Sequence, residues 1–337
     1  MIVLAGILAP GCAVPEPDEP GQGSTFAGPE AVWQGSPRAL MQSARTRCAD
    51  LKGAARRRCF FSVLEALGAS PQAIRFAGRL EEPGVLLALR EAGPVAVARV
   101  LYPLRGDASE GRLLVNGRPP MVDVDDDEFW PLDALKKMPE YQRLRSSRPD
   151  LRVRPGDRVV PGALAVRQQA DGRRRFMAGY VLESGAEAGE VAGVVDFAFD
   201  FDQDGTFLES TVHAVAGMVH AVAGETVTLT VKRTGEGDSG WRAVRVPPAD
   251  RLRLVSKALE PGVGGDPASE AWTFRALIPG RVPVILQHLP GKGQGAWPDQ
   301  RASFLVVTHA SREERDSVLE APFREAIDRR LQDIRSP

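Results

Sequence analysis

The stretch EPGVGGDPASEAWTFRALIPG, residues 260–280, combines two glycine-rich turns with a strand-like run between them. Gly262, Gly264 and Gly265 fall within four positions, and Pro279-Gly280 closes the run. Glycine adopts positive φ at little cost and lets a backbone approach a partner closely. We therefore predict a hairpin tip at 262–265 that leads into a strand ending at the second turn.

Strand-like runs surround this stretch on both sides. Between Glu225 and His309 the sequence reads TVTLTVKR, WRAVRV, LRLVSKAL, AWTFRAL, RVPVILQHL and SFLVVTHA, separated by Gly- and Pro-containing turns. Short strands at such regular spacing predict an all-β, immunoglobulin-like sandwich over 222–310. A C-terminal helix over 311–337 follows, because Ser311 and Glu314 form a capping box.

The part of the chain before the sandwich mixes helical and strand patterns. Residues 36–150 predict a mixed domain of helices followed by strands, and 151–221 predict a region of β hairpins. One hairpin turns at Asp171-Gly172, and another follows the alternating run from Val195 to Phe201. The predicted fold class is thus an α+β N-terminal region, then an all-β sandwich and a helix.

Residues 1–35 predict an export signal and a linker. The apolar run of residues 2–9 is too short to span a bilayer as a helix. It is similar to a lipoprotein signal with Cys12 as the acylated residue, although no Lys or Arg precedes it. A Pro-, Gly- and acid-rich tether follows. We expect an exported protein of the bacterial cell envelope or periplasm, lipid-anchored through Cys12; a frayed apolar terminus is the alternative.

Cys48 and Cys59 lie on two predicted helices that Gly53 separates. On one continuous helix they would be about 16 Å apart, too far for a bond. A helical hairpin would bring them together. We predict a disulfide if the chain is exported and two buried thiols if it stays in the cytosol.

Composition and motifs give no support to an enzyme or a nucleic-acid-binding protein. The net charge is −1, so no basic footprint for nucleic acid is present. The sequence GDSGW at 237–241 is similar to the nucleophile loop of trypsin-like proteases, but no histidine lies far enough upstream. The calcium-loop pattern at Asp200 has Thr211 where a bidentate Glu is needed. We expect no catalytic residue, no cofactor and no metal site.

Residues 224–309 resemble the chagasin family, which are protein inhibitors of papain-like cysteine proteases. That family presents three loops at one end of an immunoglobulin-like sandwich, carrying N-P-T-T-G-(Y/F)-x-W, G-x-G-G and R-P-(W/F) motifs. GVGG at 262–265 matches the second motif, and a strand, a Pro-Gly turn and another strand follow it as in the family. The Asn-Pro start of the first motif and the Arg of the third are absent here.

The resemblance implies a set of partner-binding residues. They come from remnants of the first motif, from the whole second motif and from remnants of the third: Thr234, Gly235, Trp241, Gly262, Val263, Gly264, Gly265, Pro290 and Trp297. A rigid sandwich that presents preordered loops loses little entropy on binding. The implied function is inhibition of a papain-like cysteine protease, with no chemistry on the inhibitor.

Two other functions stay open at the level of sequence. A non-enzymatic envelope lipoprotein could use the same immunoglobulin-like module for other protein contacts. An enzyme could be housed in residues 36–220, although no motif there indicates one. For Trp241, a place in the sandwich core is an alternative to partner contact, and for the glycines a plain hairpin tip is the alternative.

Overall fold

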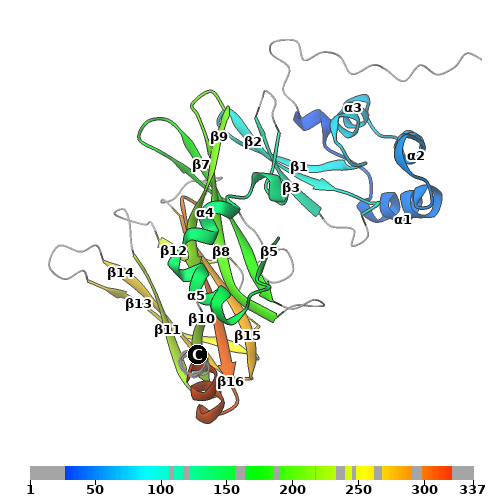
Figure 1. Cartoon of the computed structure of the whole chain (residues 1–337). Helices are drawn as coiled ribbons and strands as arrows, with labels where there is room; N and C mark the ends of the chain where they lie inside the picture. Colours follow the sequence, from blue (N-terminus) through cyan, green and yellow to red (C-terminus); the bar gives the residue numbers. More distant parts are fainter. Residues whose placement is uncertain are drawn as a thin grey trace, which may run out of the picture. The chain divides into compact units, whose positions relative to one another are not determined.

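The computed structural model describes residues 27–105, 110–116, 121–155, 164–184, 190–216, 218–232, 240–244, 248–261, 268–289 and 298–320 (Figure 1). The chain divides into two compact units, Met1–Met121 and Val122–Pro337, and each is described by itself. This division falls inside the region 36–150 that the sequence assigns to one domain. In its described part the chain is mostly β sheet with a few helices.

The first unit combines three short helices with an antiparallel sheet. A 3-10 turn (Pro29–Ala31) precedes α1 (Pro37–Cys48), α2 (Gly53–Ala66) and α3 (Pro71–Arg79), and then β1 (Val85–Ala92), β2 (Val95–Leu101) and β3 (Glu110–Asn116) pair in that order. Ser36 and Ser70 cap α1 and α3 through their hydroxyl oxygens, each followed by proline in the first turn. Phe60, Leu64 and Leu40 are fully buried and hold the helices together.

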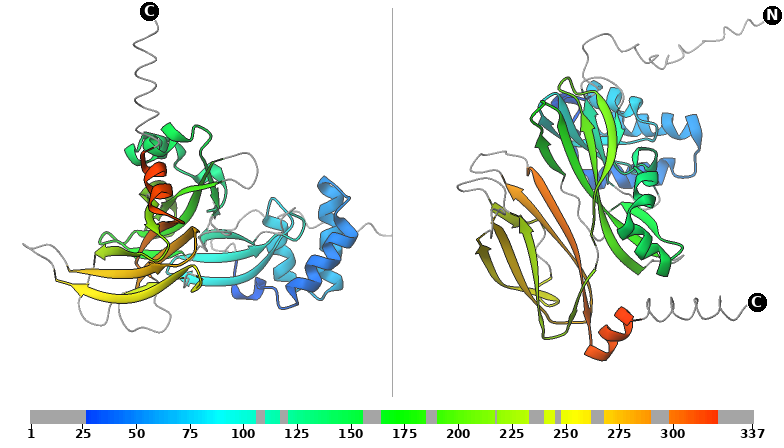
Figure 2. Two further views of the ribbon diagram at one scale, coloured as in Figure 1. Left: turned by 90° about the horizontal axis from the view of Figure 1, so that it is seen from below. Right: turned by 60° about the vertical axis from the view of Figure 1, so that its left-hand side comes forward.

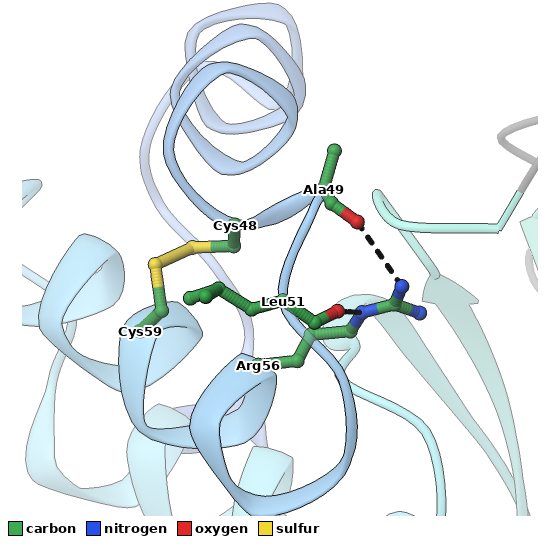
Figure 3. Close-up of a disulfide and its surroundings, with 5 residues drawn as sticks. All are labelled: Cys48, Ala49, Leu51, Arg56 and Cys59. Atoms are coloured by element: carbon green, nitrogen blue, oxygen red, sulfur yellow. Dashed lines mark hydrogen bonds between the residues drawn. A yellow bond between two sulfur atoms is a disulfide. The ribbon is translucent and has the colours of Figure 1, made fainter.

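The turn between α1 and α2 is closed by a disulfide and by an arginine (Figure 3). Cys48 and Cys59 are bonded, with their Cα atoms 5.8 Å apart. The Arg56 guanidinium donates to the carbonyl oxygens of Leu51 at 2.6 Å and Ala49 at 3.1 Å. Gly53 has φ of 51°, which lets the chain reverse between the two helices. The helical hairpin predicted around Gly53 is therefore present, with both cysteines in its core.

Removal of this disulfide is expected to destabilise the first unit. Cys48→Ala together with Cys59→Ala opens a loop of sequence separation 11, and the chain-entropy model gives a loss of about 3 kcal/mol for a loop of this size. Circular dichroism of the helices during urea unfolding measures the change. Addition of a reductant should give the same loss in the unmodified chain and none in the double variant; equal midpoints for all samples would contradict the prediction.

The second unit begins with two short helices and a five-stranded antiparallel sheet. After β4 (Val122–Asp123) and a 3-10 turn (Asp127–Phe129) come α4 (Leu132–Lys137) and α5 (Pro139–Ser147). The sheet contains β5 (Arg152–Pro155), β6 (Ala165–Gln168), β7 (Arg174–Ser184), β8 (Glu190–Phe201) and β9 (Phe207–Ala216). Both predicted hairpins occur, β6–β7 and β8–β9, and Gly172 and Gly205 adopt positive φ in their turns.

An aromatic cluster covers one face of this sheet. Phe176, Phe197, Phe199 and Phe201 are fully buried on alternate positions of β7 and β8, as the alternation in the sequence predicts. Trp130 packs on Tyr180 with ring centroids 5.1 Å apart. Its indole N–H donates to the Val124 carbonyl oxygen at 2.9 Å, so the 3-10 turn is fixed to the sheet. These contacts explain why residues 122–150 belong to the second unit.

The C-terminal half of this unit is a two-sheet sandwich (Figures 1 and 2). One sheet has the order β10 (Met218–Val222), β16 (Gln300–His309), β15 (Gly280–Leu289), β12 (Gly240–Ala243). The other has the order β11 (Thr226–Lys232), β14 (Ser269–Ala276), β13 (Leu252–Glu260). Apolar side chains of both sheets share one core, among them Leu229, Trp272, Val284, Leu286 and Val306. The predicted strands of 225–309 are confirmed, and β10 precedes them in the chain.

The four-stranded sheet is buried on both faces. Val282, Val284 and Leu286 point into the sandwich, whereas Ile285, Leu305 and Val307 pack on Val181 and Val194 of the five-stranded sheet. The alternation of a strand places neighbours on opposite faces, which allows one strand to serve two cores. The second unit is thus three sheet layers deep.

A buried ion pair joins the two sheets that meet here. Arg301 Nε lies 2.9 Å from Asp196 Oδ1, and the two side chains are 0% and 2% exposed. The Ser303 hydroxyl donates to the same oxygen at 3.0 Å. A Cβ on Gly179 would lie 2.1 Å from the guanidinium, so only glycine leaves room for it. Asp200, in the calcium-like pattern, is likewise buried and forms an ion pair with Arg175.

The C-terminal helix begins as the capping box predicts. The Ser311 hydroxyl accepts from the Glu314 N–H at 3.2 Å, and Glu314 Oε2 accepts from the Ala310 N–H at 2.7 Å. Residues 312–320 are helical, and the remainder of the predicted range 311–337 lies outside the described residues. No helix in the described part of the chain is both long and apolar enough to cross a membrane.

Acid is expected to destabilise the second unit through a histidine pair. His220 Nδ1 and His309 Nε2 are 2.8 Å apart, and their rings stack with centroids 5.1 Å apart. Burial lowers the pKa of His220, and the charges of His309, Arg148 and Arg315 lower it further. As the pH falls through the ordinary histidine pKa, the unfolded chain therefore binds more protons than the folded one. The free energy of unfolding decreases as the pH decreases.

The measurement is the urea midpoint at about pH 7.5 and about pH 5.5, on either side of the ordinary histidine pKa. Glu314 Oε1 lies 3.8 Å from His309 Nδ1 and offsets part of the repulsion. We expect a lower midpoint at the acidic pH and a smaller drop for His220→Gln. A drop of unchanged size in His220→Gln would contradict the assignment.

Candidate functional site

The stems of three loops gather at one end of the sandwich. In the three-stranded sheet, Lys232 pairs with Ser269, and Ser269 also pairs with Glu260. The chain therefore leaves β11 and β13, and enters β14, at the same edge. The connections 233–239 and 261–268 both begin there.

In the four-stranded sheet, the strand ends that carry loops also lie together at one edge. Gly240 pairs with Leu289, and His288 pairs with Gln300. The end of β15, the start of β12 and the start of β16 thus lie together. The connections 233–239 and 290–299 meet the sheet at this edge.

Trp241 joins the two edges. Its indole N–H donates to the Lys232 carbonyl oxygen at 2.9 Å, and its backbone N–H donates to Glu270 Oε1 at 3.3 Å. Lys232 and Glu270 belong to the three-stranded sheet, whereas Trp241 belongs to β12 of the other. The six residues Lys232, Gly240, Glu260, Ser269, Leu289 and Gln300 therefore surround one end of the sandwich, which we name the loop pole.

An ion pair between an exposed lysine and a buried glutamate lies under the loop pole. The Lys257 ammonium is 2.7 Å from Glu270 Oε2 and donates to the Trp241 carbonyl oxygen at 2.7 Å. It also lies 4.7 Å from the centre of the Trp272 ring. The Glu270 side chain is only 7% exposed. These contacts hold β12, β13 and β14 in fixed positions, which gives rigid stems to the first two loops.

A histidine and an aspartate close the base of the third loop. His288 Nδ1 lies 2.7 Å from Asp299 Oδ1, and the Asp299 N–H donates to the His288 carbonyl oxygen at 3.1 Å. The His288 ring lies beside Trp241, with centroids 5.6 Å apart. The two ends of 289–298 are thereby held together. The His288 Nε2 atom is buried and has no hydrogen-bond partner among the described residues.

Of the partner-binding residues that the resemblance implies, the structure describes only Trp241. Thr234, Gly235, the four residues Gly262 to Gly265, Pro290 and Trp297 lie outside the described residues, as does Cys12. Trp241 is 5% exposed and part of the core, because its ring fills the space between the two sheets. Its indole therefore offers no free face to a partner, and we assign it to the base of the loop pole.

Sequence reasoning missed the polar residues under the loops. Glu270, Lys257 and Asp299 stand among many other charged residues, and nothing local distinguishes them. The one available signal is position: Lys257 and Glu270 lie on strands that border a predicted turn, and Asp299 directly precedes such a strand. Cross-strand register, which decides their partners, cannot be obtained from one sequence.

Among known proteins, no protein-family model and no curated protein matches the chain. Part of this chain is similar to a cysteine protease inhibitor of Entamoeba histolytica. That crystal structure aligns at 14% identity with a TM-score of 0.25, over 28% of this chain and 86% of the inhibitor chain. The case for a function therefore depends on the residues and geometry of the chain itself.

The described residues offer no arrangement for metal chemistry. Across those ranges, no group of three or more His, Cys, Asp or Glu side chains is placed to hold a metal ion. The D-x-D-x-D-G pattern forms a hairpin turn in which Asp202 Oδ1 accepts from the N–H groups of Asp204 and Thr206 at 2.9 and 2.8 Å. These bonds give Asp202 a structural role in the turn.

Proposed function

We propose that the sandwich binds and inhibits papain-like cysteine proteases through the three loops of the loop pole, 233–239, 262–267 and 290–297. The observation that supports this most is the convergence of the three loop stems on one end of the sandwich. Apart from Trp241, which lies on β12, the residues that match the chagasin-like motifs fall on the same three connections. Stems at separate ends would have left no common surface for a protease cleft.

The strand order supports the immunoglobulin-like part of the proposal. Sheets β10-β16-β15-β12 and β11-β14-β13 follow the two-sheet pattern of such domains, in which the last strands neighbour each other in one sheet. The glycines at 262, 264 and 265 allow a narrow backbone tip. Braced stems reduce the entropy that the loops lose on binding.

The proposal is tested by titration of the full chain against papain. The unmodified chain should inhibit, and Gly264→Trp should raise the concentration for half-inhibition about 30-fold or more, because a bulky side chain blocks the tip at a binding hot spot. Asp250→Trp is the matched control. Asp250 is exposed and lies next to β13 at the other end of the sandwich.

The control variant should inhibit like the unmodified chain. Absence of inhibition by the unmodified chain, or an equal loss in both variants, would overturn the proposal. If a pull-down partner other than a protease were lost in Gly264→Trp alone, the loops would serve the alternative role of a non-enzymatic binding module.

We further propose that the chain is exported and anchored through a lipid on Cys12. The disulfide between Cys48 and Cys59 supports this, because such bonds persist mainly in oxidising compartments outside the cytosol. Mass spectrometry of membrane-fractionated protein should find a diacylglyceryl group on Cys12. An intact segment before Cys12 in the membrane fraction would contradict the anchor.

A further inference from the structure

The helices of the first unit are strongly basic, whereas the chain as a whole is nearly neutral. Between Pro37 and Arg79 there are nine Lys or Arg residues and only two Asp or Glu residues, a formal charge of +7, against −1 for the entire chain. This segment is α1, α2 and α3 with their connections. The proposed protease site, which lies in the other unit, uses none of it.

Some of these cations have structural partners within the unit. Arg57 donates to the Leu80 carbonyl oxygen at 2.6 Å, Arg45 donates to the Pro103 carbonyl oxygen at 3.2 Å, and Arg56 binds the α1–α2 turn. The acceptors of all three arginines are carbonyl oxygens, which leave the positive charge uncompensated. The charge therefore contributes in full to the field around the helices.

Five other cations are exposed to solvent: Arg38, Arg47, Lys52, Arg58 and Arg75. None of them forms an ion pair with a residue that the structure describes. Arg58 lies two positions before buried Phe60, and Arg75 lies two positions after buried Ala73, so both project away from the helical core.

The helices are short and linked, so the five charges belong to one small segment. α1, α2 and α3 contain 12, 14 and 9 residues, which corresponds to lengths of about 13–21 Å. The disulfide joins α1 to α2. At physiological salt the Debye length is about 8 Å, so binding through these charges should depend strongly on salt concentration.

We propose that α1, α2 and α3 form a basic surface that docks on anionic phospholipid headgroups. Charge complementarity supports this occupant, because clustered Lys and Arg residues bind negatively charged bilayers. The proposed export, which the disulfide supports, would put this segment in an oxidising compartment, where lipid headgroups are available and nucleic acid is not the usual polyanion.

Two exposed leucines lie at the ends of α2 in the same basic segment. Leu51, beside Lys52 in the α1–α2 turn, is 37% exposed, and Leu67, at the end of α2, is 36% exposed. Apolar side chains within a basic helical surface can enter the interface of a bilayer. Docking is a property of these helices, independent of acylation at Cys12 and of the protease site.

The test uses the full chain with Cys12→Ser, so that no acyl chain contributes. Co-sedimentation is measured with vesicles of phosphatidylcholine mixed with phosphatidylglycerol, and with vesicles of phosphatidylcholine alone. We expect binding to the mixed vesicles only, and its loss when the Debye length is reduced to about 3 Å by high salt.

The decisive variant replaces Arg38, Arg47, Arg58 and Arg75 by Gln. Each cation near an anionic bilayer is worth about a factor of five, so affinity should fall by about 100-fold or more. A matched control replaces four exposed arginines of the second unit, Arg143, Arg242, Arg253 and Arg275, by Gln and should bind as before.

Circular dichroism and an intact Cys48–Cys59 bond verify that each variant is folded. The proposal would be overturned by absence of binding to mixed vesicles at low salt, or by an equal loss in the two variants. Tighter binding of a double-stranded DNA oligonucleotide than of mixed vesicles would also overturn it, because the surface would then serve a different polyanion.

Discussion

Asp196→Ala is expected to lower the free energy of unfolding of the second unit by about 3–5 kcal/mol, because the Arg301 guanidinium would stay buried without its carboxylate. The Arg301 side chain is 0% exposed and lies between the five-stranded and four-stranded sheets. Water cannot replace the missing charge there at low cost. Urea unfolding followed by tryptophan fluorescence measures the loss.

A double variant separates the cost of a broken pair from the value of the pair itself. Asp196→Leu combined with Arg301→Met removes both charges and keeps apolar volume between the sheets. Replacement of a buried ion pair by apolar residues is often neutral or stabilising. We expect the double variant to recover most of the lost stability; a loss equal to that of Asp196→Ala would contradict the role assigned to the pair.

Trp241→Ala is expected to cost about 3–5 kcal/mol, as large-to-small substitutions of buried aromatic residues do. The same substitution should abolish inhibition of papain, because Trp241 connects the edges of both sheets beneath the three loops. The indole is 5% exposed, so the loss of inhibition would come from misplaced stems and not from lost contact area. Urea unfolding and the papain titration are measured on the same sample.

The second buried tryptophan of the sandwich provides the control. Trp272 is also 5% exposed, but its indole Nε1 has no hydrogen-bond partner, whereas that of Trp241 donates to Lys232. Trp241→Phe removes the part-buried hydrogen bond to the Lys232 carbonyl oxygen and should be destabilising. Trp272→Phe removes an N–H that has no partner among the described residues and should cost less. The reverse order would contradict the account of the loop pole.

Most strands of the second unit could be predicted from the sequence. The alternation through Val195 and Phe201 predicted β8 and its aromatic face, and Asp171-Gly172 predicted the β6–β7 turn. Local patterns of this kind depend on the period of two and on turn chemistry, both visible in a short window. The helical hairpin around Gly53 was predicted on the same local basis.

The layers and the loop bracing could not be predicted in this way. Asp196 alternates with the aromatic residues as a solvent-facing residue would, yet Arg301, 105 positions later, covers it. For Trp241 the sequence favoured a place in the core over partner contact but left both open, until the pairing of β12 with β15 placed it inside. Register between distant strands decides both cases, and one sequence does not contain it.

Calorimetric titration of papain into the full chain tests most directly whether the loop pole enters a protease cleft. Two forms of papain are compared: the free enzyme, and enzyme whose cleft is filled by a small covalent active-site inhibitor. The account predicts one-to-one binding to the free enzyme and no heat with the blocked one, because both ligands need the same space. Equal binding to both forms, or no binding to either, would contradict it.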